Sequence, residues 1–254
     1  MITKIELDSL VKKYETIDFI KDDPIQFVHR SKCKEEAELY GFIASLFAYG
    51  NRKIFIKKLD EIFSKSEGNL LEFIKNGDFS SLKDVEYRFS KEHDIIPIFE
   101  ILSKLYNESE GLEDLFAYSW TQACFDHQQF LQTVVDYFYS NAPKIVGQGF
   151  YHMIPNPNNG GAMKRINMFL RWMVRKGPVD LGIWEFIKPK DLLIPLDVHV
   201  ARVSRQMGLL ERKSNDFKAV QELTNNLTKF CPEDPVKYDF AMFAFGIKIN
   251  YNMK

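Results

Sequence analysis

The sequence predicts an all-α fold, and three observations support this prediction. Apolar residues recur every three or four positions along most of the chain, which is the spacing of a buried helix face. No segment shows the sustained alternation of apolar and polar residues that is typical of a half-buried strand. Helix-start signals precede periodic segments, most clearly where Asp234 is followed by Pro235.

The expected helices follow one another along the chain. Residues 33–50 (CKEEAELYGFIASLFAYG) begin polar and become apolar on every side, which predicts a helix inside a core. Apolar stripes predict amphipathic helices at 51–65, 91–106, 127–141, 160–177, 197–210, 214–230 and 233–247.

Residues 140–166 form the longest stretch without helical periodicity. Their prolines and glycines, among them Pro143, Pro155, Gly160 and Gly161, predict a loop or a set of tight turns. We therefore expect one all-α unit over residues 1–254, built either as two helical lobes that meet near 140–165 or as a single bundle.

Composition excludes several classes of protein. The chain has 254 residues, is 45% hydrophobic and carries a formal charge of −1, which suits a large helical core. No apolar run is long enough for a membrane span, and the charged N-terminus is not typical of a signal peptide. The cysteines Cys33, Cys124 and Cys231 lack the spacing of a zinc or iron–sulfur site. We expect a cytoplasmic monomer without a metal, a cofactor or a membrane partner.

Charge is distributed unevenly, because residues 161–210 contain nine Lys or Arg and only four Asp or Glu. Such a segment on an otherwise acidic chain indicates an anionic partner such as nucleic acid, or simply a solvated helix face. Lys164 stands in the first turn of the helix expected at 160–177, where a cation is disfavoured and its pKa is expected to fall. The glycines before it could let phosphate approach the helix amides; the alternative is an exposed surface charge.

Asp197 stands at the start of the next predicted helix, in "LLIPLDVHVARVSRQMGLL" (192–210). A carboxylate is favoured at that position because it accepts hydrogen bonds from the helix amides. Taken alone, Asp197 is interpreted as an ordinary helix cap.

The two segments together resemble the catalytic core of the helix-hairpin-helix DNA glycosylase superfamily. The resemblance rests on "GGAMKRINMFLRW" and "PLDVHVARVSRQMGLL", with a lysine opening one helix and an aspartate opening the next. Their separation of 33 residues is more similar to the archaeal 8-oxoguanine glycosylase branch than to endonuclease III-like members. The hairpin, "IPNPNNGGA", departs from the usual hydrophobic-Pro-Gly-x-Gly turn, and the four-cysteine cluster of endonuclease III is absent.

Nearly the full chain also resembles a bacterial family of conserved hypothetical proteins without an assigned reaction. This resemblance is carried by "FIASLFAYGNRK", "INMFLRWMVR" and "DPVKYDFA".

The glycosylase resemblance implies a two-lobed helical fold with a degenerate helix-hairpin-helix, and excision of an oxidised purine such as 8-oxoguanine from double-stranded DNA. Lys164 would form a Schiff base at the sugar C1′, and Asp197 would stabilise positive charge on the sugar or help deprotonate the lysine. Two helix starts facing one cleft would bring these groups together.

Further candidates follow from this hypothesis. Substrate-binding candidates are Tyr49, Asn51, Arg52, Trp172 and His199; phosphate-binding candidates are Gly160, Gly161, Arg165, Arg171, Arg175, Arg202 and Arg205. Each has a structural alternative, namely a helix corner, a core side chain or a solvated face. The alternative functions are a non-catalytic nucleic-acid-binding or scaffold protein with this fold, and a helical domain without a nucleic-acid role.

Overall fold

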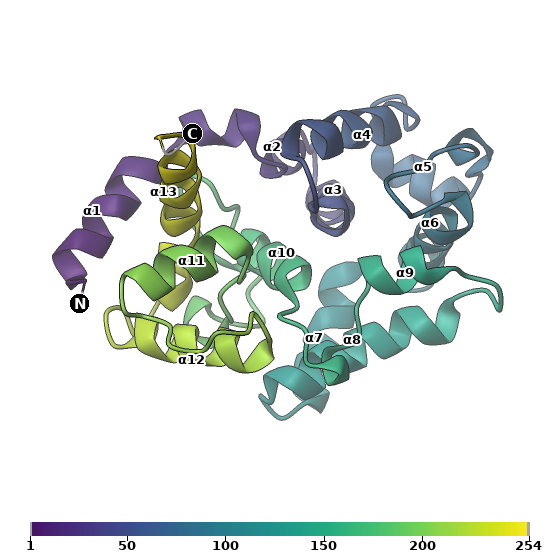
Figure 1. Cartoon of the computed structure of the whole chain (residues 1–254). Helices are drawn as coiled ribbons and strands as arrows, with labels where there is room; N and C mark the ends of the chain where they lie inside the picture. The colour runs from purple at the N-terminus through teal and green to yellow at the C-terminus, as the bar shows by residue number, and fades with distance from the viewer. Residues whose placement is uncertain (1, 253–254) are drawn as a thin grey trace. The chain divides into compact units, whose positions relative to one another are not determined.

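The computed structural model describes residues 2–252, and in these residues the chain forms α-helices and short 3-10 helices (Figure 1). The described residues contain isolated β-bridges but no β-strand. The predicted all-α fold is therefore confirmed. None of the described helices is both long enough and apolar enough to cross a membrane.

The chain divides into two compact units. Unit 1 combines residues 1–25 with residues 160–254, and unit 2 consists of residues 26–159. Unit 2 is thus inserted into unit 1 along the sequence. The short helix α2 (Ile25–Val28) begins at the first of these boundaries.

Unit 2 is built around α3 (Lys34–Phe47), which is buried at every residue from Glu36 to Phe47. This burial confirms the expectation that an all-round apolar helix lies inside a core. The other helices of unit 2 are α4 (Arg52–Ser64), α5 (Leu70–Asn76), η2 (Ser80–Leu82), α6 (Glu92–Glu108), α7 (Leu112–Gln122), α8 (His127–Asn141), α9 (Gln148–Met153) and η3 (Pro157–Asn159).

Aromatic rings fill the centre of unit 2. Phe42 of α3 stacks on Phe138 of α8 with ring centroids 5.1 Å apart, and Phe116 of α7 meets Phe130 of α8 edge-on. All four rings are at most 1% exposed. Burial of such rings supplies much of the stability of a helical core, which accounts for the many phenylalanines in the sequence.

A helix, α9, lies inside residues 140–166, so the prediction of a loop throughout that stretch was wrong. Phe150 and Met153 of α9 are fully buried and anchor it to the unit. α9 packs against α6, and a Cβ on Gly149 would lie 2.4 Å from the Asp94 carboxylate. The glycine therefore serves close helix packing here, which the loop interpretation overlooked.

Unit 1 has α13 as its centre, packed against both α1 and α11. The α1–α13 contact buries Tyr14, Ala241 and Ala244, which confirms that the closing segment is a core helix. The elements of unit 1 are α1 (Lys4–Tyr14), η1 (Ile17–Asp22), α10 (Lys164–Val174), η4 (Pro189–Asp191), α11 (Val198–Gln206), α12 (Phe217–Thr228), η5 (Pro235–Lys237) and α13 (Tyr238–Asn252).

The start of the last helical segment differs from the expectation in one detail. Pro235 begins the 3-10 helix η5 as predicted, but the Asp234 side chain makes no cap hydrogen bond. Its Oδ2 instead accepts a hydrogen bond from Arg175 Nε at 2.7 Å. An ion pair with a distant segment therefore replaces the predicted local cap.

Candidate active site

Lys164 is the first residue of α10, as predicted. The residue before it, Met163, is the N-cap and adopts a left-handed conformation with φ 49° and ψ 30°, and it supplies no side-chain cap. Left-handed backbone is costly for a residue with a long side chain, and such strain is concentrated at functional sites. The N-cap residue therefore provides no side-chain hydrogen-bond acceptor for the first backbone amides of α10, which lie next to Lys164.

Asp197 is the N-cap of α11, also as predicted. Its Oδ1 accepts hydrogen bonds from the backbone amides of His199 and Val200, each at 2.8 Å. Both cap bonds use the same oxygen, and within residues 2–247, whose side chains the structure describes, Oδ2 has no hydrogen bond. The carboxylate can therefore hold the helix start with one oxygen and present the other to a substrate.

The amine of Lys164 lies in the electrostatic field of three carboxylates within unit 1. Burial lowers the pKa of Lys164 below its usual value of 10.5, while Asp197, Asp23 and Asp239 act in the opposite direction, in that order. Its side chain is only partly exposed. Among the described residues, no carboxylate forms an ion pair within 4.0 Å of this amine. The lysine is thus held near acids without a direct salt bridge.

Asp239, in the first turn of α13, is a member of this group that sequence reasoning did not identify. Burial raises the pKa of Asp239 to about 7, Arg171 opposes this effect, and Asp197 adds to it. Its Oδ2 accepts a hydrogen bond from Arg171 Nη1. Asp239 and Lys164 also influence each other electrostatically, so the protonation state of one affects the pKa of the other. The only signal in the sequence was an acidic residue early in an otherwise apolar helix.

Arg171 and Arg175 lie inside unit 1, where they bind carboxylates. Arg171 Nε donates to Asp180 at 3.1 Å, and Arg175 Nη1 donates to the other oxygen of Asp180 at 3.0 Å. Arg175 also pairs with Glu15 of the N-terminal segment. Both guanidinium groups are at most 8% exposed, so their charges serve the interior of the unit rather than a surface.

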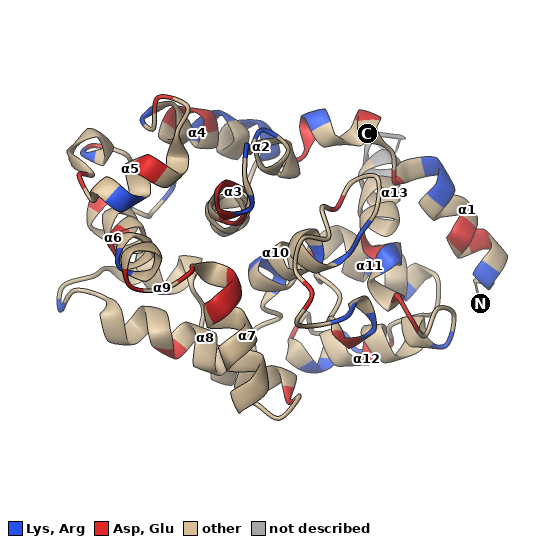
Figure 2. Ribbon diagram, turned by 180° about the vertical axis from the view of Figure 1, so that it is seen from behind, with Lys and Arg blue, Asp and Glu red and all other residues tan. Residues whose placement is uncertain are grey.

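The remaining arginines of this segment also contact the protein itself. Arg202 donates to the carbonyl of Gly246 in α13, and Arg205 donates to the carbonyls of Arg212, Lys213 and Ser214. Acidic and basic residues are interspersed along the helices of unit 1 (Figure 2). Two of the nine basic residues of 161–210, Arg171 and Arg175, are therefore neutralised by buried carboxylates, and two more, Arg202 and Arg205, are held by backbone carbonyls.

The other predicted residues of unit 1 take different environments. Trp172 is fully buried in α10 and belongs to the core. His199 is partly exposed in the first turn of α11, with its ring 5.8 Å from that of Phe243. Arg165 is also partly exposed. The glycines Gly160 and Gly161 have open space where a Cβ would be, so a backbone-bound ligand could approach them.

Tyr49, Asn51 and Arg52 all belong to unit 2. Asn51 caps α4 by accepting hydrogen bonds from the amides of Lys53 and Ile54, and Arg52 is the first residue of that helix. Tyr49 lies in the segment between α3 and α4, where its ring meets those of Tyr87 and His152. The structure thus brings these three together at one helix corner, with Tyr49 in an aromatic cluster.

A family model described as "Protein of unknown function (DUF2400)" matches residues 23–248. The chain belongs to the DUF2400 family. The matched region includes Lys164, Asp197, Asp239 and Asp23, hence every ionisable group of the candidate site. No curated protein and no solved structure matches the sequence.

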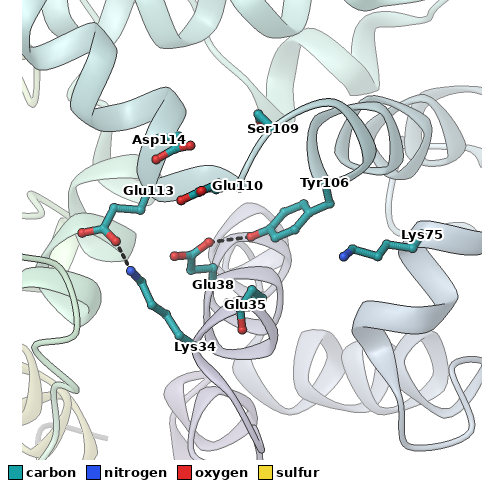
Figure 3. Close-up of a pocket in the computed structure, with 9 residues that line it drawn as sticks. All are labelled: Lys34, Glu35, Glu38, Lys75, Tyr106, Ser109, Glu110, Glu113 and Asp114. Carbon is teal, nitrogen blue, oxygen red and sulfur yellow. Dashed lines mark hydrogen bonds and ion pairs between the residues drawn. The ribbon is translucent and has the colours of Figure 1, made fainter.

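The DUF2400 chain also has a pocket of about 340 Å³ in unit 2, remote in sequence from Lys164 (Figure 3). It is lined by five carboxylates, two lysines, Ser109 and Tyr106. The Tyr106 hydroxyl donates to Glu38 at 2.6 Å, and Lys34 pairs with Glu113. Burial and then Glu38 raise the pKa of Tyr106 well above 10. Two pairs of these groups thus bind one another, and the acidic lining disfavours a phosphate-containing ligand.

Metal binding finds no support in this geometry. Within residues 2–252, no group of three or more His, Cys, Asp and Glu side chains is arranged to hold a metal ion. Cys33 and Cys124 are exposed and Cys231 is partly exposed, and all three are free thiols. The chemistry that the candidate site can perform on its own is proton transfer and amine nucleophilicity.

Proposed function

We propose that this protein is a DNA glycosylase and AP lyase that removes an oxidised purine by forming a Schiff base on Lys164. The observation that carries the proposal is a partly buried amine at a helix start, with a lowered pKa, electrostatically coupled to the capping carboxylate of a second helix start. The order of these groups in the sequence is that of the glycosylase superfamily, which supports the same reaction.

The lowered pKa matters because only the neutral amine is a nucleophile. Lys164 attacks C1′ of the damaged nucleotide, a C–N bond forms, and the glycosidic bond breaks with its electron pair leaving on the base. The departing base takes up a proton, and the lysine nitrogen loses one to a carboxylate. Asp239, which titrates near pH 7, is suited to accept that proton.

Asp197 has a separate task in this proposal. Positive charge develops on the sugar as the base departs, and an ionised carboxylate nearby stabilises it. Its Oδ1 is occupied by the helix cap, which fixes the orientation of the group. The C1′–O4′ bond then breaks with its electron pair on O4′, which takes up a proton, and the nitrogen lone pair forms an iminium at C1′. Loss of a C2′ proton with expulsion of the 3′ phosphate then nicks the strand.

The internal pairing of Arg171 and Arg175 favours a second candidate, a non-catalytic scaffold protein that retains this fold. Because these guanidinium groups bind carboxylates of unit 1, the basic segment supplies fewer phosphate contacts than its composition indicates. A protein of this kind would retain the helix starts of Lys164 and Asp197 for structural reasons.

Borohydride trapping on oligonucleotides separates these candidates. Duplexes containing 8-oxoguanine or an abasic site are incubated with the full chain and reduced. A covalent adduct that disappears in Lys164→Gln and persists in Lys218→Ala, an exposed lysine of α12, supports the lyase. Tight binding without an adduct supports a non-catalytic DNA-binding protein with this fold. A chain that neither binds nor forms an adduct contradicts the lyase and supports the scaffold.

A further inference from the structure

A tight turn in unit 2 presents a cation and an aromatic ring side by side. Tyr87 and Ser90 exchange two backbone hydrogen bonds of 2.9 and 3.0 Å, which leaves Arg88 and Phe89 at the tip. Arg88 has φ +59°, a position where glycine is usual in such turns. Phe89 is 49% exposed, and Arg88 is exposed beside it.

The tip is supported from behind by further aromatic rings. The ring of Phe89 lies 4.6 Å from that of His152 and 6.0 Å from that of Tyr49, between centroids. The hydroxyl of Tyr49 is within hydrogen-bonding distance of Ser90 Oγ at 3.2 Å, and Tyr87 donates to the Tyr49 carbonyl. These contacts support one side of the Phe89 ring and leave its other side exposed.

Positive charge accompanies these rings. The Arg88 guanidinium lies 5.8 Å from the centre of the Tyr49 ring, and its Nη1 would be 2.4 Å from a Cβ on Gly50. Residues 49–58 contain four Lys or Arg and no acidic residue, and one of these, Lys58, is paired with Glu61. Acids also flank the turn: Glu86 is paired with Lys91, Glu92 accepts a hydrogen bond from the Asp84 amide, and Asp94 is buried. The surface therefore joins cations to an exposed π face.

We propose that the Arg88–Phe89 tip binds a DNA strand, with Phe89 stacking on an unpaired base and Arg88 contacting the adjacent phosphate. Aromatic rings that stack on bases, interleaved with cations that track phosphates, are the common means of holding unstacked nucleotides. The identity of the nucleic acid as DNA rests on the proposed function, whereas the surface itself does not include Lys164. Tyr49, expected from the sequence to stack on a base, is instead a support for the ring that does.

Unit 2 contains a matched control for this surface. Phe125, in the turn between α7 and α8, is 71% exposed and has φ +70°, so it is a second phenylalanine at a strained turn. Its surroundings lack cations, because residues 109–143 contain no Lys or Arg, and α7 and α8 show no blue in Figure 2. The turn at Phe125 therefore has an exposed aromatic ring but no neighbouring Lys or Arg in the sequence to bind a phosphate.

The test is DNA binding by fluorescence anisotropy, using a labelled single-stranded oligonucleotide and a duplex with a single-base bulge. For the full chain, Phe89→Ala is expected to weaken binding on the order of tenfold to a hundredfold. Arg88→Asn, which tolerates positive φ, is expected to reduce the slope of log affinity against log salt by about one. Phe125→Ala is expected to bind as the wild type does. Arg88→Gly should bind weakly yet melt at an equal or higher temperature, which separates lost binding from lost folding.

Wild-type affinity in Phe89→Ala and Arg88→Asn, or an equal loss in Phe125→Ala, overturns the inference. Borohydride trapping distinguishes this failure from that of the proposed function. If Lys164 forms an adduct at the same DNA concentrations with and without Phe89, the lyase stands and the surface fails. If Phe89 is needed for binding and no adduct forms, the surface stands and the lyase fails.

Discussion

Asp197 has two tasks in the proposed mechanism, and two substitutions separate them. Asp197→Ala removes both cap hydrogen bonds of 2.8 Å and should lower the free energy of unfolding by about 1 kcal/mol. Over a chain of this size that corresponds to a melting temperature about 2–4 °C lower. Asp197→Asn keeps a good capping oxygen, so its stability should stay within a few tenths of a kcal/mol of the wild type. Calorimetry measures both values.

Base release should be slower in both variants, because both lose the negative charge of Asp197. Removing a preorganised group that stabilises the transition state costs on the order of 10²–10³ in rate, so Asp197→Asn should be nearly as slow as Asp197→Ala in single-turnover base release. The negative charge of Asp197 raises the pKa of Lys164 and partly offsets the effect of burial. Asp197→Asn removes that charge, so the pKa of Lys164 should fall below its wild-type value and the rising limb of the pH–rate profile should move to lower pH. An Asp197→Asn chain that turns over at the wild-type rate would refute the catalytic role.

Three further predictions concern the surroundings of the site. Arg171→Met removes the counterion of Asp180 and Asp239 and should lower the free energy of unfolding in urea by about 3–5 kcal/mol. Arg212→Met breaks a more exposed pair with Asp216 and should have a much smaller effect. Equal losses in the two variants would contradict the role of burial. Asp239 has a pKa of about 7 in the folded protein against 3.8 in the unfolded chain, so its contribution to stability is greatest in acid and is lost as pH rises from about 4 to 7. The free energy of unfolding of Asp239→Asn, measured across that pH range, should lack this decline. The same dependence of stability on pH in the variant and the wild type would argue against the raised pKa. Gly149→Ala places a Cβ 2.4 Å from the Asp94 carboxylate and 2.7 Å from Ser90 Cα and should cost about 1–3 kcal/mol, whereas Gly161→Ala has open space and should melt as the wild type does.

Local patterns predicted most of the helices well. The apolar stripe of α10 at Ile166, Phe169, Leu170 and Met173 is at most 3% exposed, as its spacing indicated. Helix α7 was not predicted, although Leu112, Leu115, Phe116 and Trp120 have the same kind of spacing and are buried. The apolar spacing of α7 was present in the sequence, but the polar residues between these apolar positions obscured it.

The partners of buried charges could not be predicted from the sequence in the same way. Arg171 and Arg175 have the spacing of an exposed face, and only the fold shows that Glu15, Asp234 and Asp239 converge on them from distant segments. Lys164 and Asp197, by contrast, were found because helix starts leave a local signature. Asp239 was missed because its importance depends on α13 meeting α10, which is a tertiary property.

The insertion of unit 2 within unit 1 has a consequence for biosynthesis. Residues 26–159 leave the ribosome as one uninterrupted piece and can collapse on their own core as soon as they emerge. Helix α1 and Glu15 must wait until α10 and α13 have been translated, since Arg175 and Ala241 are among their partners. The acids around Lys164 are therefore assembled last, and a chain that stalls between residue 159 and α13 has its insert translated but lacks the segment that supplies Asp239.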